Sequence, residues 1–71
     1  MSIEELLTLA KGIKDKGDMV FIKLDGEREN NQITIIISYP NDKGKEQIRY
    51  EGDDLNECLF KAINSYYHND L

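Results

Sequence analysis

The sequence predicts one small α+β domain over residues 1–71, in the order helix, three antiparallel strands, helix. Apolar residues recur at helical spacing near both ends of the chain, and apolar residues alternate with polar ones between them. Gly and Pro interrupt the pattern between the expected strands. Because 71 residues support one core, the two helices should pack on one face of a three-stranded sheet.

The first helix is expected over residues 2–16, and a second helix follows the strands. Ser2 and Glu5 form a capping box, and Gly17 is a suitable stop. Either Asp53 or Asp54 can cap the second helix. The first apolar stripe is Ile3, Leu6, Leu7, Ala10 and Ile13, and the second is Leu55, Cys58, Leu59, Ala62, Ile63 and Tyr66.

The three strands are expected at Met19–Leu24, Ile33–Tyr39 and Glu46–Tyr50. A polar loop containing Gly26 joins the first two, and Pro40 with the tight turn Asn41–Glu46 joins the last two. The residues expected on the core face are Val20, Ile22, Ile33, Ile35, Ile37 and Tyr39. The opposite face should carry Met19, Phe21 and Ile36, either as a tolerated apolar spot or as the contact of a back-to-back homodimer.

Composition restricts the partners of the chain. A net charge of −5 and a pI near 4.7 argue against direct binding of nucleic acid or anionic lipid and allow a basic protein partner, although the charge could serve solubility alone. Double-stranded RNA binding domains share the element order but need basic phosphate contacts, whereas the second helix here begins with Asp53, Asp54 and Glu57. No membrane span or signal peptide is expected, and the single Cys58 suits a reducing cytoplasm.

We find no catalytic motif in the sequence and expect no enzyme, metal or cofactor. His68 has no recognisable orienting partner, and Cys58 lies on an apolar stripe where a small core residue is expected. The carboxylates of the second helix lack the spacing of a calcium loop. Binding is therefore the expected role, and two acidic groups could carry it. The first is the turn residues Asp42, Gly44 and Glu46, and the second is Glu51, Asp53, Asp54 and Glu57, for which helix capping is the alternative explanation.

A further pattern runs over nearly the whole chain. It comprises Met1-x-Ile3-x-x-Leu6, Ile13-Lys14 with Lys16, Val20, Lys23-Leu24-x-Gly26, Ile33-Thr34, Asn41-Asp42…Gly44-x-Glu46, Glu57 and Ala62. In order and spacing it resembles the small phage-encoded anti-CRISPR proteins that inhibit Cas9 by imitating the DNA around the PAM. The resemblance implies a protein of the host bacterial cytoplasm that acts without catalysis. By this resemblance, the loop with Asp42, Gly44 and Glu46 would bind the pair of arginines with which Cas9 reads guanines.

The chain departs from this family in two respects. Its turn is one residue longer and carries Lys43 and Lys45, which dilute the negative charge. The family continues into a strongly acidic segment with aromatic residues, whereas here only Asp70 is acidic after Glu57. The alternative is a small phage or bacterial adaptor that binds another basic protein, as a monomer or a homodimer.

Overall fold

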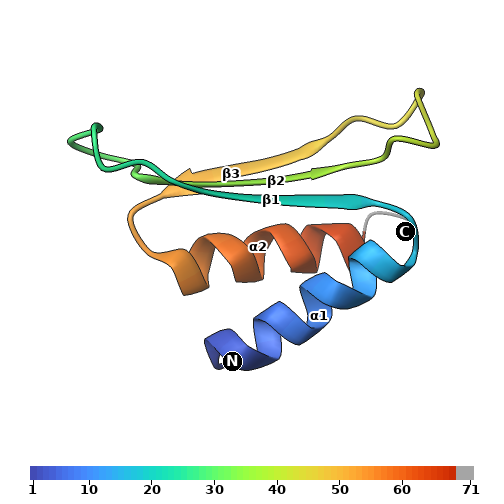
Figure 1. Ribbon diagram of the computed structural model, residues 1–71, viewed down its shortest axis with the longest axis horizontal. Helices are drawn as coiled ribbons and strands as arrows, with labels where there is room; N and C mark the ends of the chain where they lie inside the picture. The colour runs from blue at the N-terminus through green and yellow to red at the C-terminus, as the bar shows by residue number, and fades with distance from the viewer. Residues whose placement is uncertain (69–71) are drawn as a thin grey trace.

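The computed structural model describes residues 1–68 and confirms the predicted order of elements. These are α1 (Ile3–Asp15), β1 (Met19–Leu24), β2 (Ile33–Ser38), β3 (Ile48–Gly52) and α2 (Leu55–His68). The central strand β2 pairs antiparallel with both β1 and β3. Both helices cover the same face of this sheet, as predicted (Figure 1). No helix in the described part of the chain is long and apolar enough to cross a membrane.

The helix ends are held by the capping groups that the sequence suggested. The Glu5 backbone N–H donates to Ser2 Oγ at 3.2 Å, and the Ser2 N–H donates to Glu5 Oε1 at 3.1 Å. Gly17 follows α1 at a φ of 90°, which a residue with a side chain rarely adopts. Asp54 caps α2, because its Oδ1 accepts the Glu57 N–H at 3.1 Å. These contacts fix where both helices start and where α1 gives way to β1.

The core lies between the helices and the sheet. Cys58 belongs to it, as predicted, and its Sγ lies so close to Gly52 that a Cβ added at that glycine would be 2.8 Å from the sulfur. No larger residue fits at the end of β3 without a shift of α2. The buried residues of the core cluster are Leu6, Ala10, Ile13, Ile35, Ile37, Cys58, Leu59, Ala62 and Ile63.

The third strand begins two residues later than predicted, at Ile48 instead of Glu46, and extends to Gly52. Two consecutive backbone turns account for the difference, with the Asp42 N–H bonded to Tyr39 O and the Lys45 N–H bonded to Asp42 O. The chain therefore rejoins the ladder only where Ile37 pairs with Ile48. The expected tight turn is thus a longer loop over residues 39–47.

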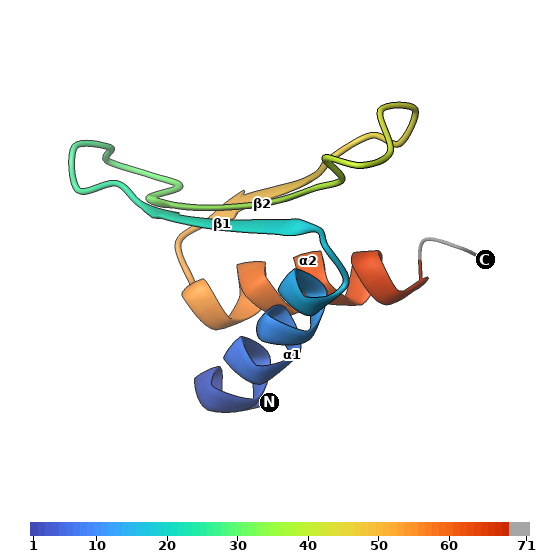
Figure 2. The same cartoon turned by 45° about the vertical axis from the view of Figure 1, so that its right-hand side comes forward.

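Ile22 lies on the predicted core face of the sheet but is not buried in the core. Its side chain is on the helix side of β1, but it is 40% exposed, and Leu24 beyond it is 66% exposed. A short turn connects the C-terminal end of α1 to the start of β1. The N-terminal end of the helix lies farther from the sheet (Figures 1 and 2). As a result, α1 covers the beginning of β1 near Val20 and leaves the end of the strand open.

Candidate functional site

The loop between β2 and β3, residues 39–47, carries the first predicted acidic group and is ordered by local hydrogen bonds. Besides the two backbone turns, the Gly44 N–H donates to Asp42 Oδ1 at 3.3 Å. This is the Asx arrangement in which an aspartate mimics a turn of backbone. Gly44 itself is not at a positive φ, and a Cβ there would meet Asp42 Oδ1 at 3.7 Å, an ordinary contact. The fold does not require glycine at this position.

Aromatic residues secure the base of the loop. The ring of Tyr39 stacks on Tyr66 of α2 at 5.8 Å between centroids, and Lys45 Nζ lies 4.5 Å from the centroid of Tyr39. Tyr66 Oη donates to Asp18 Oδ2 at 2.6 Å. Burial and this contact with Asp18 raise the pKa of Tyr66, so the phenol stays protonated as the donor. The loop is therefore attached to the end of α2 as well as to two strands.

Two carboxylates of this loop remain available to a partner. Asp42 and Glu46 are both exposed. Within residues 1–68 neither side chain forms an ion pair, and the contact of Asp42 with Gly44 uses only one of its oxygens. A carboxylate with an unoccupied oxygen can accept a hydrogen bond from a guanidinium group.

The structure brings the four residues of the second acidic group together. Glu51, Asp53, Asp54 and Glu57 line one hollow of about 250 Å³ between β3 and α2. Each of them already has a contact within the chain. Asp54 caps α2, and Glu57 Oε1 accepts from Lys61 Nζ at 2.9 Å. The hollow is acidic, but its carboxylates are less available than those of the loop at residues 39–47.

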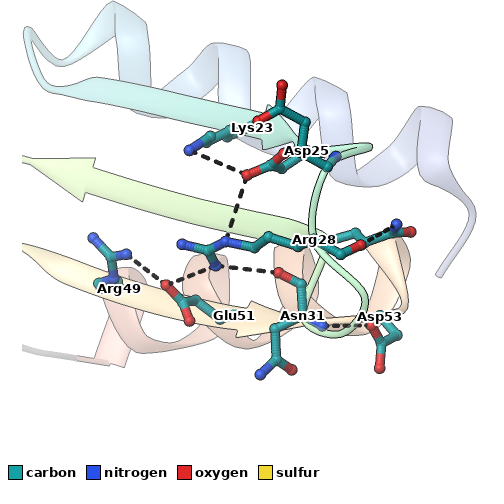
Figure 3. A network of polar contacts seen from close by, with 9 residues as sticks. Lys23, Asp25, Arg28, Asn31, Arg49, Glu51 and Asp53 are labelled. Carbon is teal, nitrogen blue, oxygen red and sulfur yellow. Dashed lines mark hydrogen bonds and ion pairs between the residues drawn. The ribbon is translucent and has the colours of Figure 1, made fainter.

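The other two members of this group belong to a polar network that we did not predict (Figure 3). Asp53 Oδ1 accepts the backbone N–H of Asn31 at 2.7 Å, which ties the β1–β2 loop to the start of α2. Glu51 accepts from Arg49 and lies 3.6 Å from Nη1 of Arg28. Lys23 and Asp25 also belong to this network. The polar composition of residues 25–32 was the only sequence signal for it.

The two acidic groups do not form one continuous surface. The loop at residues 39–47 enters β3, and the hollow lies where β3 leads into α2, so the groups are at opposite ends of this strand (Figure 1). At about 3.3 Å per residue, Glu46 and Glu51 are separated by roughly 17 Å of extended chain. A positive side chain lies between them, because Arg49 is in the middle of β3. A partner would have to contact the two groups separately.

The outer face of the sheet carries the predicted self-association residues, but their apolar area is limited. Met19 and Phe21 are exposed, and Ile36 is half-buried. On the same face Thr34 is only 3% exposed. The cross-strand neighbours of Thr34 are Lys23 and Glu51, and these belong to the network of charged side chains at that end of the sheet.

The network predicts an acid-dependent stability. The hydrogen bond from Arg49 lowers the pKa of Glu51. The ionised Glu51 therefore contributes to stability above its unfolded-state pKa of about 4.3. This contribution is lost as the pH falls through the lower pKa of the folded state. Glu51→Gln should therefore be less stable than wild type in urea at neutral pH and closer to it near pH 3. The control is Glu29→Gln, which removes an exposed carboxylate that takes no part in these ion pairs. Equal pH dependence in wild type and Glu51→Gln would contradict the prediction.

The fold and these surfaces define a small two-layer α+β domain with exposed carboxylates on one ordered loop. Comparisons of the chain with protein-family models, curated proteins and solved structures find no significant match.

Proposed function

We propose that this protein is an anti-CRISPR inhibitor that binds Cas9 or a related effector and blocks recognition of the PAM. The observation that supports the proposal best is the pair of exposed carboxylates, Asp42 and Glu46, on a loop attached to two strands and to α2. Effectors of this type read guanines with arginine side chains, which also form paired, charge-assisted hydrogen bonds with carboxylates. The inhibitor would act by occupancy and would catalyse no reaction.

The order of the loop also supports the proposal. Ordering a mobile loop on binding costs free energy, and a loop that is already ordered avoids much of that cost. Here the Asp42 backbone and side chain both take part in turns, and Lys45 lies over Tyr39. The second acidic group would contribute mainly through its negative field, which speeds association with a basic surface.

Binding and cleavage assays with a panel of Cas9 orthologues test this proposal. We expect the protein to bind at least one orthologue loaded with guide RNA and to inhibit cleavage by it. Prior incubation of that effector with duplex containing its PAM should prevent binding, whereas duplex without a PAM should not. Failure to bind any member of the panel, or binding that a PAM duplex does not affect, would contradict the proposed mechanism.

An adaptor that binds another basic protein is the second candidate, and the charge of the loop favours it. Within residues 39–47, the two carboxylates of Asp42 and Glu46 are balanced by the two ammonium groups of Lys43 and Lys45, which gives no net charge. A bare arginine pair would be matched better by a net negative loop. Co-purification of the tagged protein from bacterial lysate, with a partner other than a Cas9-type effector recovered in stoichiometric amounts, would support this second function.

A further inference from the structure

Strand β1 is an edge of the sheet, and part of its backbone is unpaired. The Asp25 N–H donates to the carbonyl oxygen of Gln32 at 2.7 Å, and hydrogen-bonded residues alternate along an antiparallel pair. In the register of β1 and β2, the residues that bond to β2 are therefore Met19, Phe21 and Lys23. The intervening residues, Val20, Ile22 and Leu24, turn their N–H and C=O groups away from β2, and no strand of the described chain pairs with them.

Apolar side chains flank this open edge on both faces of the sheet. Met19 and Phe21 are 43% and 49% exposed on the outer face, and Ile22 and Leu24 are more than a third exposed on the helix face. Lys23 is the only charged residue of the strand. An exposed apolar edge strand with few charges is a template for pairing with another strand.

The opposite edge of the sheet is different. By the same alternation, β3 turns the backbone of Arg49 and Glu51 outward. Both residues are charged, and they are joined by an ion pair. Charged residues are a common protection of edge strands against pairing. The sheet therefore has one protected edge, β3, and one open edge, β1.

We propose that β1 pairs with β1 of a second copy of this chain, antiparallel, around a twofold axis through Ile22. In this register Ile22 lies opposite its own counterpart, and Val20 lies opposite Leu24 of the partner subunit. These three residue pairs form about six backbone hydrogen bonds and join the two sheets into one. On the outer face, Lys23 meets the ring of Phe21 of the partner subunit, a favourable cation–π pair. An axis through Lys23 would instead place like charges opposite each other.

This edge-to-edge dimer fits the observations better than the back-to-back contact of two outer faces. The outer face offers Met19, Phe21 and Ile36 beside a charged network, whereas the edge uses Phe21 together with the exposed Ile22 and Leu24. Only pairing at the edge satisfies the unpaired backbone groups of β1. It is independent of any inhibitor function, because the loop at residues 39–47 is not part of this interface.

Molar mass from light scattering or sedimentation, measured from low to high micromolar concentration, tests the proposal. We expect the mass to rise toward that of a dimer. Because the Ile22 N–H does not bond to β2, Ile22→Pro should weaken the dimer at least about tenfold and leave the fold intact. Arg49→Pro, the same change at an outward position of β3, is the matched control and should dimerise as wild type does. A monomeric wild type at all concentrations, or equal effects of the two prolines on folded protein, would overturn the proposal.

Amide hydrogen exchange provides a second measurement that does not depend on a variant. In the dimer, the N–H groups of Val20, Ile22 and Leu24 should exchange more slowly as the protein concentration rises. A back-to-back dimer would leave those three amides unprotected, and that result would overturn edge pairing even if the mass doubled. If Ile22→Pro fails to fold by circular dichroism, Leu24→Lys places a charge at the same edge and should give a monomer.

Discussion

An Asp42→Asn, Glu46→Gln variant is expected to bind the effector about 2–5 kcal/mol more weakly than wild type, with its free energy of unfolding changed by less than about 0.5 kcal/mol. Affinity should fall because both arginines of the effector would lose a charged partner while remaining buried. Stability should hardly change, because both side chains are exposed and form no ion pair within residues 1–68. Asparagine retains the acceptor for the Gly44 N–H, so the loop should keep its shape.

The matched control carries the same change in charge at the other end of the sheet. Glu27→Gln, Glu29→Gln removes two exposed carboxylates from the β1–β2 loop and should bind nearly as tightly as wild type. Isothermal titration with the effector, and urea unfolding of each variant, provide the two readouts. A comparable loss of affinity in both double variants would show a general effect of net charge, and would remove the loop at residues 39–47 from the binding site.

Leu59→Ala is expected to leave the protein largely unfolded at room temperature. Leu59 is fully buried where α2 packs on the sheet, and truncation of a buried leucine costs about 2–5 kcal/mol. A single core of this size rarely supplies more than about 3–5 kcal/mol of stability. The cavity left by the missing side chain would therefore remove most of the margin that keeps the chain folded.

Leu7→Ala in α1 makes the same chemical change at a position that is 39% exposed. Its cost should be clearly smaller, because little new cavity forms at the surface. Circular dichroism followed against urea concentration, for wild type and both variants, measures the difference. If Leu59→Ala and Leu7→Ala unfolded at the same urea concentration, α2 would not pack on the sheet as described.

The fold could be predicted because its signals are local. Ser2 with Glu5, and Gly17, specify the ends of α1 through contacts that span only a few residues. The start of β3 was less predictable, because Glu46 and Gln47 fit a strand as well as a loop, and the turns after Tyr39 decided between them. The exposure of Ile22 depends on the direction in which α1 leaves the sheet, and the alternation of apolar residues does not encode that direction.

In the candidate site, too, local features could be predicted and long-range contacts could not. The sequence identified the acidic residues but not their partners inside the chain. Asp53 meets the backbone of Asn31, 22 residues away, and Glu51 of β3 meets Arg28 of the β1–β2 loop. Such contacts arise only when the β1–β2 loop folds over the end of β3. They separate carboxylates that stabilise the fold from Asp42 and Glu46, which remain open to a partner.

The close packing of Cys58 against Gly52 makes this cysteine an internal reporter of helix detachment. The sulfur is buried, and burial raises the pKa of the thiol, so little reactive thiolate is present at neutral pH. Cys58 lines the hollow between β3 and α2 but is only 4% exposed, so an alkylating reagent should react with it much faster once α2 separates from β3. The rate of labelling therefore measures how often this layer opens, in the native protein and without an introduced probe. Any partner that clamps α2 onto the sheet would slow that reaction.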